Sequence, residues 1–199
     1  MKHLIDHARL FAEQTAQQPH EFRRLAAGQS PHALFITCSD SRVVPSLITG
    51  ARPGELFELR TAGNAVPRHT AEHPSGEAAT IEYAVTVLGV PHIVVCGHSH
   101  CGAVTARVRG EDLSAIPAVA RWLSSQLPDD LGELHEDGSV EVAAAAQRNV
   151  REQLARLRDY PCVAERIAAG RLRLHGWFYA VDTGLVLAHQ PSLDTFLPR

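Results

Sequence analysis

Two short apolar runs constrain the fold of this chain more than any other feature of its sequence. Residues 33–37 and 92–96 are dominated by Ile, Val, Leu and Phe, and each has the length of a strand that is buried on both faces. A further apolar run at 56–60 and a helical pattern of apolar residues at 76–88 lie between them. This alternation of strands and helices predicts an α/β fold with a central, mainly parallel β-sheet flanked by helices.

An amphipathic segment precedes this pattern. Residues 2–17 carry an apolar stripe at helical spacing, and a cluster of helix-breaking residues follows at 28–31. We therefore expect one domain over 1–199, with an N-terminal helical arm at 1–28 and an α/β core at 29–199. The stripe, which must pack on its own domain or on a partner, consists of Leu4, Ile5, Ala8, Phe11 and Ala12.

The second half of the chain continues the α/β pattern. After a polar, acidic loop around residues 128–139, the apolar residues from 142 to 157 line one face of a long helix. Residues 171–179 alternate between polar and apolar, and a turn then leads into a last apolar run at 185–188. We expect these two segments to add strands to the sheet.

The composition excludes several classes of partner. Of the 199 residues, 45% are hydrophobic, and the formal net charge is −3, so the chain lacks the basic surface that nucleic-acid binding requires. No apolar run is long enough to span a membrane, and the N-terminal residues lack the apolar core of a signal peptide. Four cysteines in such a chain fit a reducing compartment. We expect a cytoplasmic protein with neither nucleic-acid nor membrane partners.

Metal-binding residue types follow two of the predicted strands. Cys38 ends the first run, and His98 and Cys101 follow the run at 92–96. If the strand at 33–37 lies between those at 56–60 and 92–96, the loops that follow the strands at 33–37 and 92–96 border one crevice. Two thiolates and one imidazole then converge there. Zinc takes such ligands in tetrahedral geometry. Three protein ligands leave one position for water, which predicts a catalytic site for hydration of a small electrophile.

Two charged residues lie in the same loop as the first cysteine. The simplest interpretation is that Asp40 caps the helix that follows and that Arg42 is a cation on the surface. Alternatively, the two form a bidentate pair that orients the metal-bound water.

Taken together, these motifs resemble the β-class carbonic anhydrases, in particular their plant-like branch of bacterial type. The resemblance rests on 38–42 (CSDSR) and 97–102 (GHSHCG), and it continues through 60–64 (RTAGN), 81–85 (IEYAV) and 174–177 (LHGW). It therefore covers nearly the whole chain, and the motifs are highly specific.

This resemblance implies a set of residue roles in the conversion of carbon dioxide to bicarbonate. Cys38, His98 and Cys101 would bind Zn²⁺. Asp40 would either take the fourth zinc position in a closed state or pair with Arg42 and accept a hydrogen bond from the metal-bound hydroxide. The backbone N–H of Gly102 would bind bicarbonate.

The resemblance also implies a substrate pocket and an assembly. Members of the plant-like branch build the pocket from a Gln, a Phe and a Tyr, which match Gln29, Phe57 and Tyr83; without the resemblance these would be a turn residue and two core aromatics. Family members are homodimers or multiples of dimers. One departure from the motifs is Thr61, where the family usually has Asn.

Two rival functions use the same features. One is hydrolysis of carbon disulfide or carbonyl sulfide on the same fold, because the zinc motif would serve both reactions. The other is a non-catalytic module that binds zinc or bicarbonate. Retention of Asp40, Arg42 and an open fourth position argues against the second.

Overall fold

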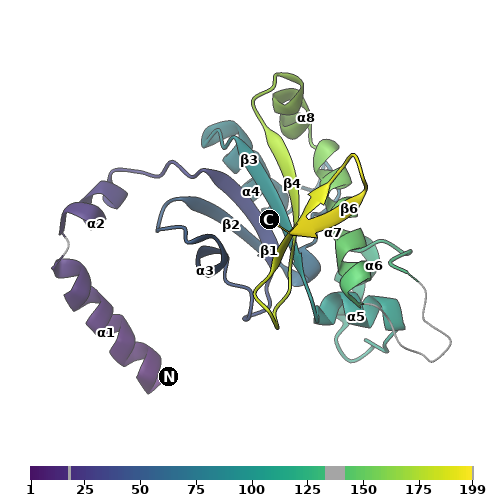
Figure 1. Ribbon diagram of the computed structural model, residues 1–199, viewed down its shortest axis with the longest axis horizontal. Helices are drawn as coiled ribbons and strands as arrows, with labels where there is room; N and C mark the ends of the chain where they lie inside the picture. Colours follow the sequence, from purple (N-terminus) through teal and green to yellow (C-terminus); the bar gives the residue numbers. More distant parts are fainter. Residues whose placement is uncertain (18, 133–141, 199) are drawn as a thin grey trace.

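The computed structural model describes residues 1–17, 19–132 and 142–198 (Figure 1). Its centre is one six-stranded sheet in the order β2-β1-β3-β4-β5-β6. The first four strands in this order are parallel, and the last two pairings are antiparallel. The strands are β1 (Ala33–Cys38), β2 (Leu56–Thr61), β3 (His92–His98), β4 (Arg173–Tyr179), β5 (Val186–Gln190) and β6 (Thr195–Pro198).

Helices connect the four parallel strands and cover the sheet. The long helix α7 packs on β3 and β4, with α8 beside it (Figure 1). The described helices are α1 (Lys2–Ala16), α2 (Pro19–Ala26), α3 (Pro45–Thr49), α4 (Gly76–Glu82), α5 (Gly102–Arg109), α6 (Pro117–Gln126), α7 (Val142–Arg158) and α8 (Pro161–Ala168). Two short segments join them, the 3₁₀ turn η1 (Ala62–Asn64) and the π-helical turn η2 (Tyr83–Val87) that continues α4.

The predicted α/β architecture is confirmed. The first strand lies between β2 and β3, as the crevice argument requires. Four elements, β6, α2, α3 and α6, are not predicted by the sequence pattern. Most of the acidic loop expected at 128–139 lies outside the described residues.

Strand β1 is buried along its whole length, because apolar side chains cover both faces of the sheet. Leu34 and Ile36 belong to the main core, which α7 helps to form, while Phe35 packs on the other face with Val94 and Cys96. A strand in such an environment needs apolar residues at every position rather than at alternate ones.

Two glycines allow α7 to lie close against the sheet. A Cβ atom at Gly97 would come within 2.8 Å of Val150 Cγ2, and one at Gly176 within 2.9 Å of Leu154 Cδ1. Real Cβ atoms do not approach neighbours so closely. Strands β3 and β4 therefore meet this helix through their backbones.

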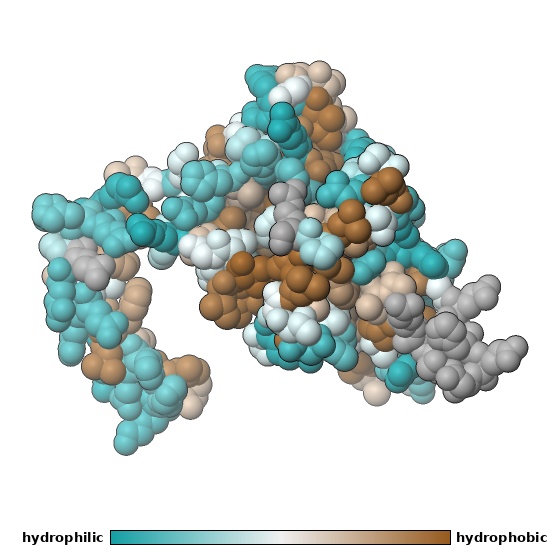
Figure 2. All heavy atoms as spheres, in the orientation of Figure 1, coloured by the Kyte–Doolittle hydropathy of each residue, from teal (hydrophilic) through white to brown (hydrophobic). Residues whose placement is uncertain are grey.

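The N-terminal helices extend away from the sheet (Figure 1). Helix α1 has no buried residue, and Phe11 stacks edge-on against Phe22 of α2, with ring centroids 5.9 Å apart. Figure 2 shows brown apolar side chains of this arm among hydrophilic ones. None of the helices in the described part of the chain is both long enough and apolar enough to cross a membrane.

Candidate metal centre

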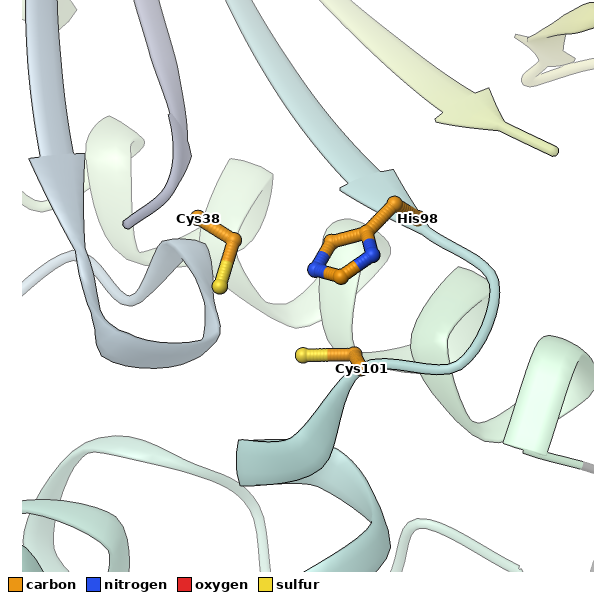
Figure 3. Close-up of side chains that lie close together, drawn as sticks. All are labelled: Cys38, His98 and Cys101. Carbon is orange, nitrogen blue, oxygen red and sulfur yellow. The ribbon is translucent and has the colours of Figure 1, made fainter. Parts of the chain in front are cut away.

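The three predicted ligands converge at the carboxyl ends of β1 and β3. Cys38 is the last residue of β1, His98 is the last residue of β3, and Cys101 precedes α5. Their ligand atoms all lie within 4.8 Å of one another, and Figure 3 shows the three side chains pointing toward a common centre. At most 6% of each residue is exposed. Among the described residues this is the one group of at least three such side chains that could hold a metal ion.

The orientation of His98 fits metal binding. Its Nδ1 lies 2.8 Å from the Ser99 carbonyl oxygen, which can only accept a hydrogen bond, so Nδ1 carries the proton. The lone pair of Nε2 then faces the two cysteines, and this buried atom has no hydrogen-bond partner in the structure. Metal-binding histidines are commonly oriented in this way, with the second nitrogen bonded to a carbonyl.

The two thiols interact as a pair. A hydrogen bond from Cys101 lowers the pKa of the Cys38 thiol, and the same contact, together with burial, raises the pKa of Cys101. Cys38 therefore ionises more readily than Cys101. Thiolate sulfur and imidazole nitrogen are ligands of soft and borderline cations, so this donor set fits a metal ion.

Asp40 and Arg42 form the bidentate pair that the sequence allowed. Arg42 Nε donates to Asp40 Oδ1 at 2.9 Å, and a terminal guanidinium nitrogen donates to Oδ2 at 2.7 Å. This pair holds the pKa of the Asp40 carboxyl well below its usual range. Asp40 Oδ2 lies 4.0 Å from His98 Nε2, so the ionised carboxylate borders the ligand cluster while bonded to Arg42.

Two further groups hold this loop, and neither role is predicted from the sequence. The carbonyl of His100 accepts a hydrogen bond from Arg42 at 3.1 Å, and His100 adopts a left-handed backbone conformation with φ 56°. The Arg60 guanidinium donates to the carbonyls of Cys38, Asp40 and Val43. Both contacts use backbone oxygens, which every residue carries, so no pattern of residue types indicates them.

Comparisons with known proteins agree with this geometry. A sequence profile described as "Carbonic anhydrase" matches residues 33–186. The carbonic anhydrase of Pseudomonas aeruginosa is 49% identical over 168 residues, which cover 83% of this chain and 76% of that protein. "Carbonic anhydrase 1" of Escherichia coli O157:H7 is 41% identical over 203 residues, which cover 100% of this chain and 92% of that protein.

Solved structures agree as well. The structure of the β-carbonic anhydrase CcaA matches with a TM-score of 0.91 at 37% identity, over 100% of this chain and 99% of that chain. This chain belongs to the β-class carbonic anhydrases. It is therefore an enzyme of the lyase class that hydrates carbon dioxide reversibly, and the comparisons do not favour the two rival functions.

The β-class carbonic anhydrase brings together part of its predicted substrate pocket. The rings of Phe57 and Tyr83 lie 5.9 Å apart, with Phe57 half-buried and Tyr83 45% exposed. Gly102 is the first residue of α5, directly after Cys101, and it is exposed. Gln29 is exposed in a surface hollow of about 550 Å³ between the arm and the turn at 53–55, and neither aromatic residue lines this hollow.

The departure from the family motif at Thr61 has a structural consequence in this carbonic anhydrase. Its hydroxyl donates to the Ala65 carbonyl at 2.9 Å and is buried. The short side chain of Thr61 therefore stabilises the turn that follows β2.

Proposed function

We propose that this carbonic anhydrase depends on zinc, held by Cys38, His98 and Cys101. The observation that carries the proposal is the buried cluster of two sulfurs and an imidazole nitrogen that has no hydrogen-bond partner. Thiolate and imidazole ligands favour zinc over the hard cations, which prefer oxygen. Bound there, zinc would act as a Lewis acid and lower the pKa of a water molecule toward neutrality.

The protein's own residues would then orient the reactants. Arg42 keeps Asp40 ionised, so this carboxylate can only accept hydrogen bonds, and it would hold the O–H of the nucleophile in one orientation. The apolar rings of Phe57 and Tyr83 would form a wall beside carbon dioxide, and Gln29 would complete the pocket. The N–H of Gly102, free in the first turn of α5, would bind a bicarbonate oxygen.

The assembly and location of the enzyme belong to the same proposal. We propose a homodimer or a multiple of dimers, supported by the exposed apolar arm and by the assembly of a similar protein. That protein is one of "two tetrameric beta-carbonic anhydrases" from Sordaria macrospora, whose structure has a TM-score of 0.78 at 32% identity over 94% of both chains. Residues 29–199 would form one core domain, with residues 1–28 as its arm. Four free cysteines support a cytoplasmic location.

Stopped-flow measurement of carbon dioxide hydration by zinc-loaded protein, together with metal analysis, tests this function. The wild-type protein is expected to bind one zinc ion per chain and to hydrate carbon dioxide. Cys101→Ala is expected to lose both stoichiometric zinc and activity. A Cys101→Ala variant that retains both would overturn the zinc assignment, and zinc-loaded wild-type protein inactive on carbon dioxide but active on carbonyl sulfide or carbon disulfide would favour the rival enzyme.

A further inference from the structure

The chain that leaves β2 beside the metal centre has an irregular and strained backbone. Gly63 and Asn64 both adopt left-handed conformations, with φ of 73° and 48°. Residues 63–67 are nonetheless buried. Backbone groups in such a place must find hydrogen-bond partners outside regular secondary structure, because leaving them unpaired in the interior costs free energy.

Side chains supply many of these partners. The Gly63 carbonyl accepts a hydrogen bond from Asn149 Nδ2 at 2.8 Å, and the Val66 N–H donates to Gln153 Oε1 at 2.7 Å. The other contacts are Trp122 Nε1 to the Ala62 carbonyl at 3.0 Å, Thr61 Oγ1 to the Ala65 carbonyl at 2.9 Å and Tyr160 Oη to the Pro67 carbonyl at 2.7 Å. The conformation of the segment thus depends on side chains from distant parts of the sequence.

Two of these side chains form a connected pair on α7. Asn149 and Gln153 are spaced one helical turn apart and are fully buried. Gln153 Nε2 donates to Asn149 Oδ1 at 2.9 Å and to the Gln126 carbonyl at 3.1 Å. Each amide is therefore held in one orientation by the other. This fixes the position of Asn149 Nδ2, which donates to the Gly63 carbonyl.

The segment they hold lies against a metal ligand. Cys38 is paired in register with Thr61, and the N–H of Ser39 donates to the Thr61 carbonyl at 3.0 Å. The turn η1, which includes Gly63, also contacts strand β1, which ends at Cys38. Gly63 also lies close to α5, because a Cβ atom added to it would come within 3.3 Å of Ala103 Cβ.

We propose that Asn149, supported by Gln153, is a positioning residue for the metal centre, since it fixes the turn at Gly63 against the ligand Cys38. This inference rests on the proposed zinc binding. Asn149 is not one of the three ligands, and it acts through the backbone of residues 62–66. Loss of such an outer partner typically weakens metal binding by about 10–100-fold.

Zinc affinity, measured by competition with a chelator, provides the test. Asn149→Ala is expected to raise the zinc dissociation constant by about 10-fold or more. In the cobalt-substituted protein the same variant is expected to shift the thiolate-to-cobalt charge-transfer absorption, because the environment of the Cys38 sulfur changes. Gln153→Met, which keeps Asn149 but removes its support, should change both quantities in the same direction and by less.

Tyr160→Phe is the matched control. It deletes one buried hydrogen bond to the same segment, at Pro67, four residues away from Gly63. Its zinc affinity and cobalt spectrum should match the wild type, even though its thermal stability falls. If Asn149→Ala yields no folded protein, the zinc affinity and cobalt spectrum of Gln153→Met are compared with those of Tyr160→Phe instead.

The possible outcomes separate this inference from the proposed function. Wild-type affinity and an unchanged cobalt spectrum in Asn149→Ala, or in Gln153→Met when that variant is the one compared, would overturn the positioning role. Equal losses of zinc affinity in Tyr160→Phe would overturn it too, since they would indicate a general effect of stability. A wild-type protein without stoichiometric zinc would instead contradict the proposed function.

Discussion

The buried Nε2 atom of His98 indicates that this side chain binds a metal ion. An imidazole nitrogen in the protein interior that has no partner is costly, on the order of 1–3 kcal/mol. His98 Nε2 is in this position, since its ring is fully buried and its other nitrogen is already bonded to Ser99. A metal ion bound at this nitrogen removes that cost. The cluster is therefore expected to be more stable with metal than without it.

Replacement of Asp40 by Asn tests its part in orienting the nucleophile. Asn keeps the shape of the side chain but loses the charge and one acceptor position that Arg42 uses. We expect Asp40→Asn to lower the rate of hydration by about 10–100-fold while zinc content stays at one per chain. The control is Asp112→Asn, which changes an exposed carboxylate that accepts a hydrogen bond from the Ser114 N–H. This variant should keep wild-type activity. Wild-type rates in Asp40→Asn would contradict the proposed orientation.

Cys96 gives a prediction for alkaline pH. Burial raises the pKa of this thiol from its ordinary value of 9.0 to about 12. Between these values the unfolded chain has lost a proton that the folded protein keeps, so the free energy of unfolding falls as the pH rises, by up to about 1.4 kcal/mol per pH unit. Urea unfolding at pH 9, 10 and 11 should show a shallower decline for Cys96→Ala than for the wild type.

The same variant is also a control for the metal centre. Cys96 lies inside β3 on the sheet face with Phe35, and it does not belong to the ligand cluster. Cys96→Ala should therefore keep one zinc ion per chain. Equal pH slopes in the two proteins would contradict the assigned burial of this thiol.

At the level of elements, the contact between α7 and the sheet organises the molecule. Apolar residues of this helix form the core with β3 and β4, and its polar residues Asn149 and Gln153 hold the segment beside the metal centre. A shift of α7 would therefore disturb both the core and the ligand Cys38. Gly176 sets the distance at which the helix packs on β4.

Gly176→Ala is expected to push α7 away from the sheet. The added Cβ would come within 3.1 Å of Leu154, Val150 and His189, so the free energy of unfolding should fall by about 1–3 kcal/mol. Gly76→Ala is the matched control, because a Cβ there meets nothing within 4 Å and alanine favours the helix. Chemical denaturation measures both. An unchanged stability for Gly176→Ala would show that the helix can move without cost.

The sequence predicts the elements of this fold better than it predicts the contacts between them. The runs at 33–37 and 92–96 indicate buried strands directly, and the ligands converge because the carboxyl ends of adjacent parallel strands meet at one edge. Asn149 lies 86 residues from Gly63, and nothing in either residue type indicates that they pair. Strand β6 has only four residues and ends in Pro198, so it carries too little pattern to be recognised.

At the scale of the whole molecule, helix α1 of the N-terminal arm has no buried residue within the described part of the chain. Leu4, Ile5, Leu10 and Phe11 are each 46–63% exposed, and the main contact of α1 is with α2. Apolar side chains gathered in this way commonly mark an interface. Gln29, predicted to complete the substrate pocket, lies at the base of the same arm. A neighbouring subunit that packs against the arm would therefore also lie close to Gln29 and bring this residue near a substrate pocket.

Removal of residues 1–16 tests this link between assembly and activity. Without α1 we expect a smaller or less stable oligomer in sedimentation experiments and a lower hydration rate at the same protein concentration. Zinc content should change less, because Cys38, His98 and Cys101 all belong to the core. Glu13→Ala, on the same helix, is the control and should sediment like the wild type. A fully active monomer of the whole chain at micromolar concentration would contradict the proposal, since its pocket would then be complete without a neighbour.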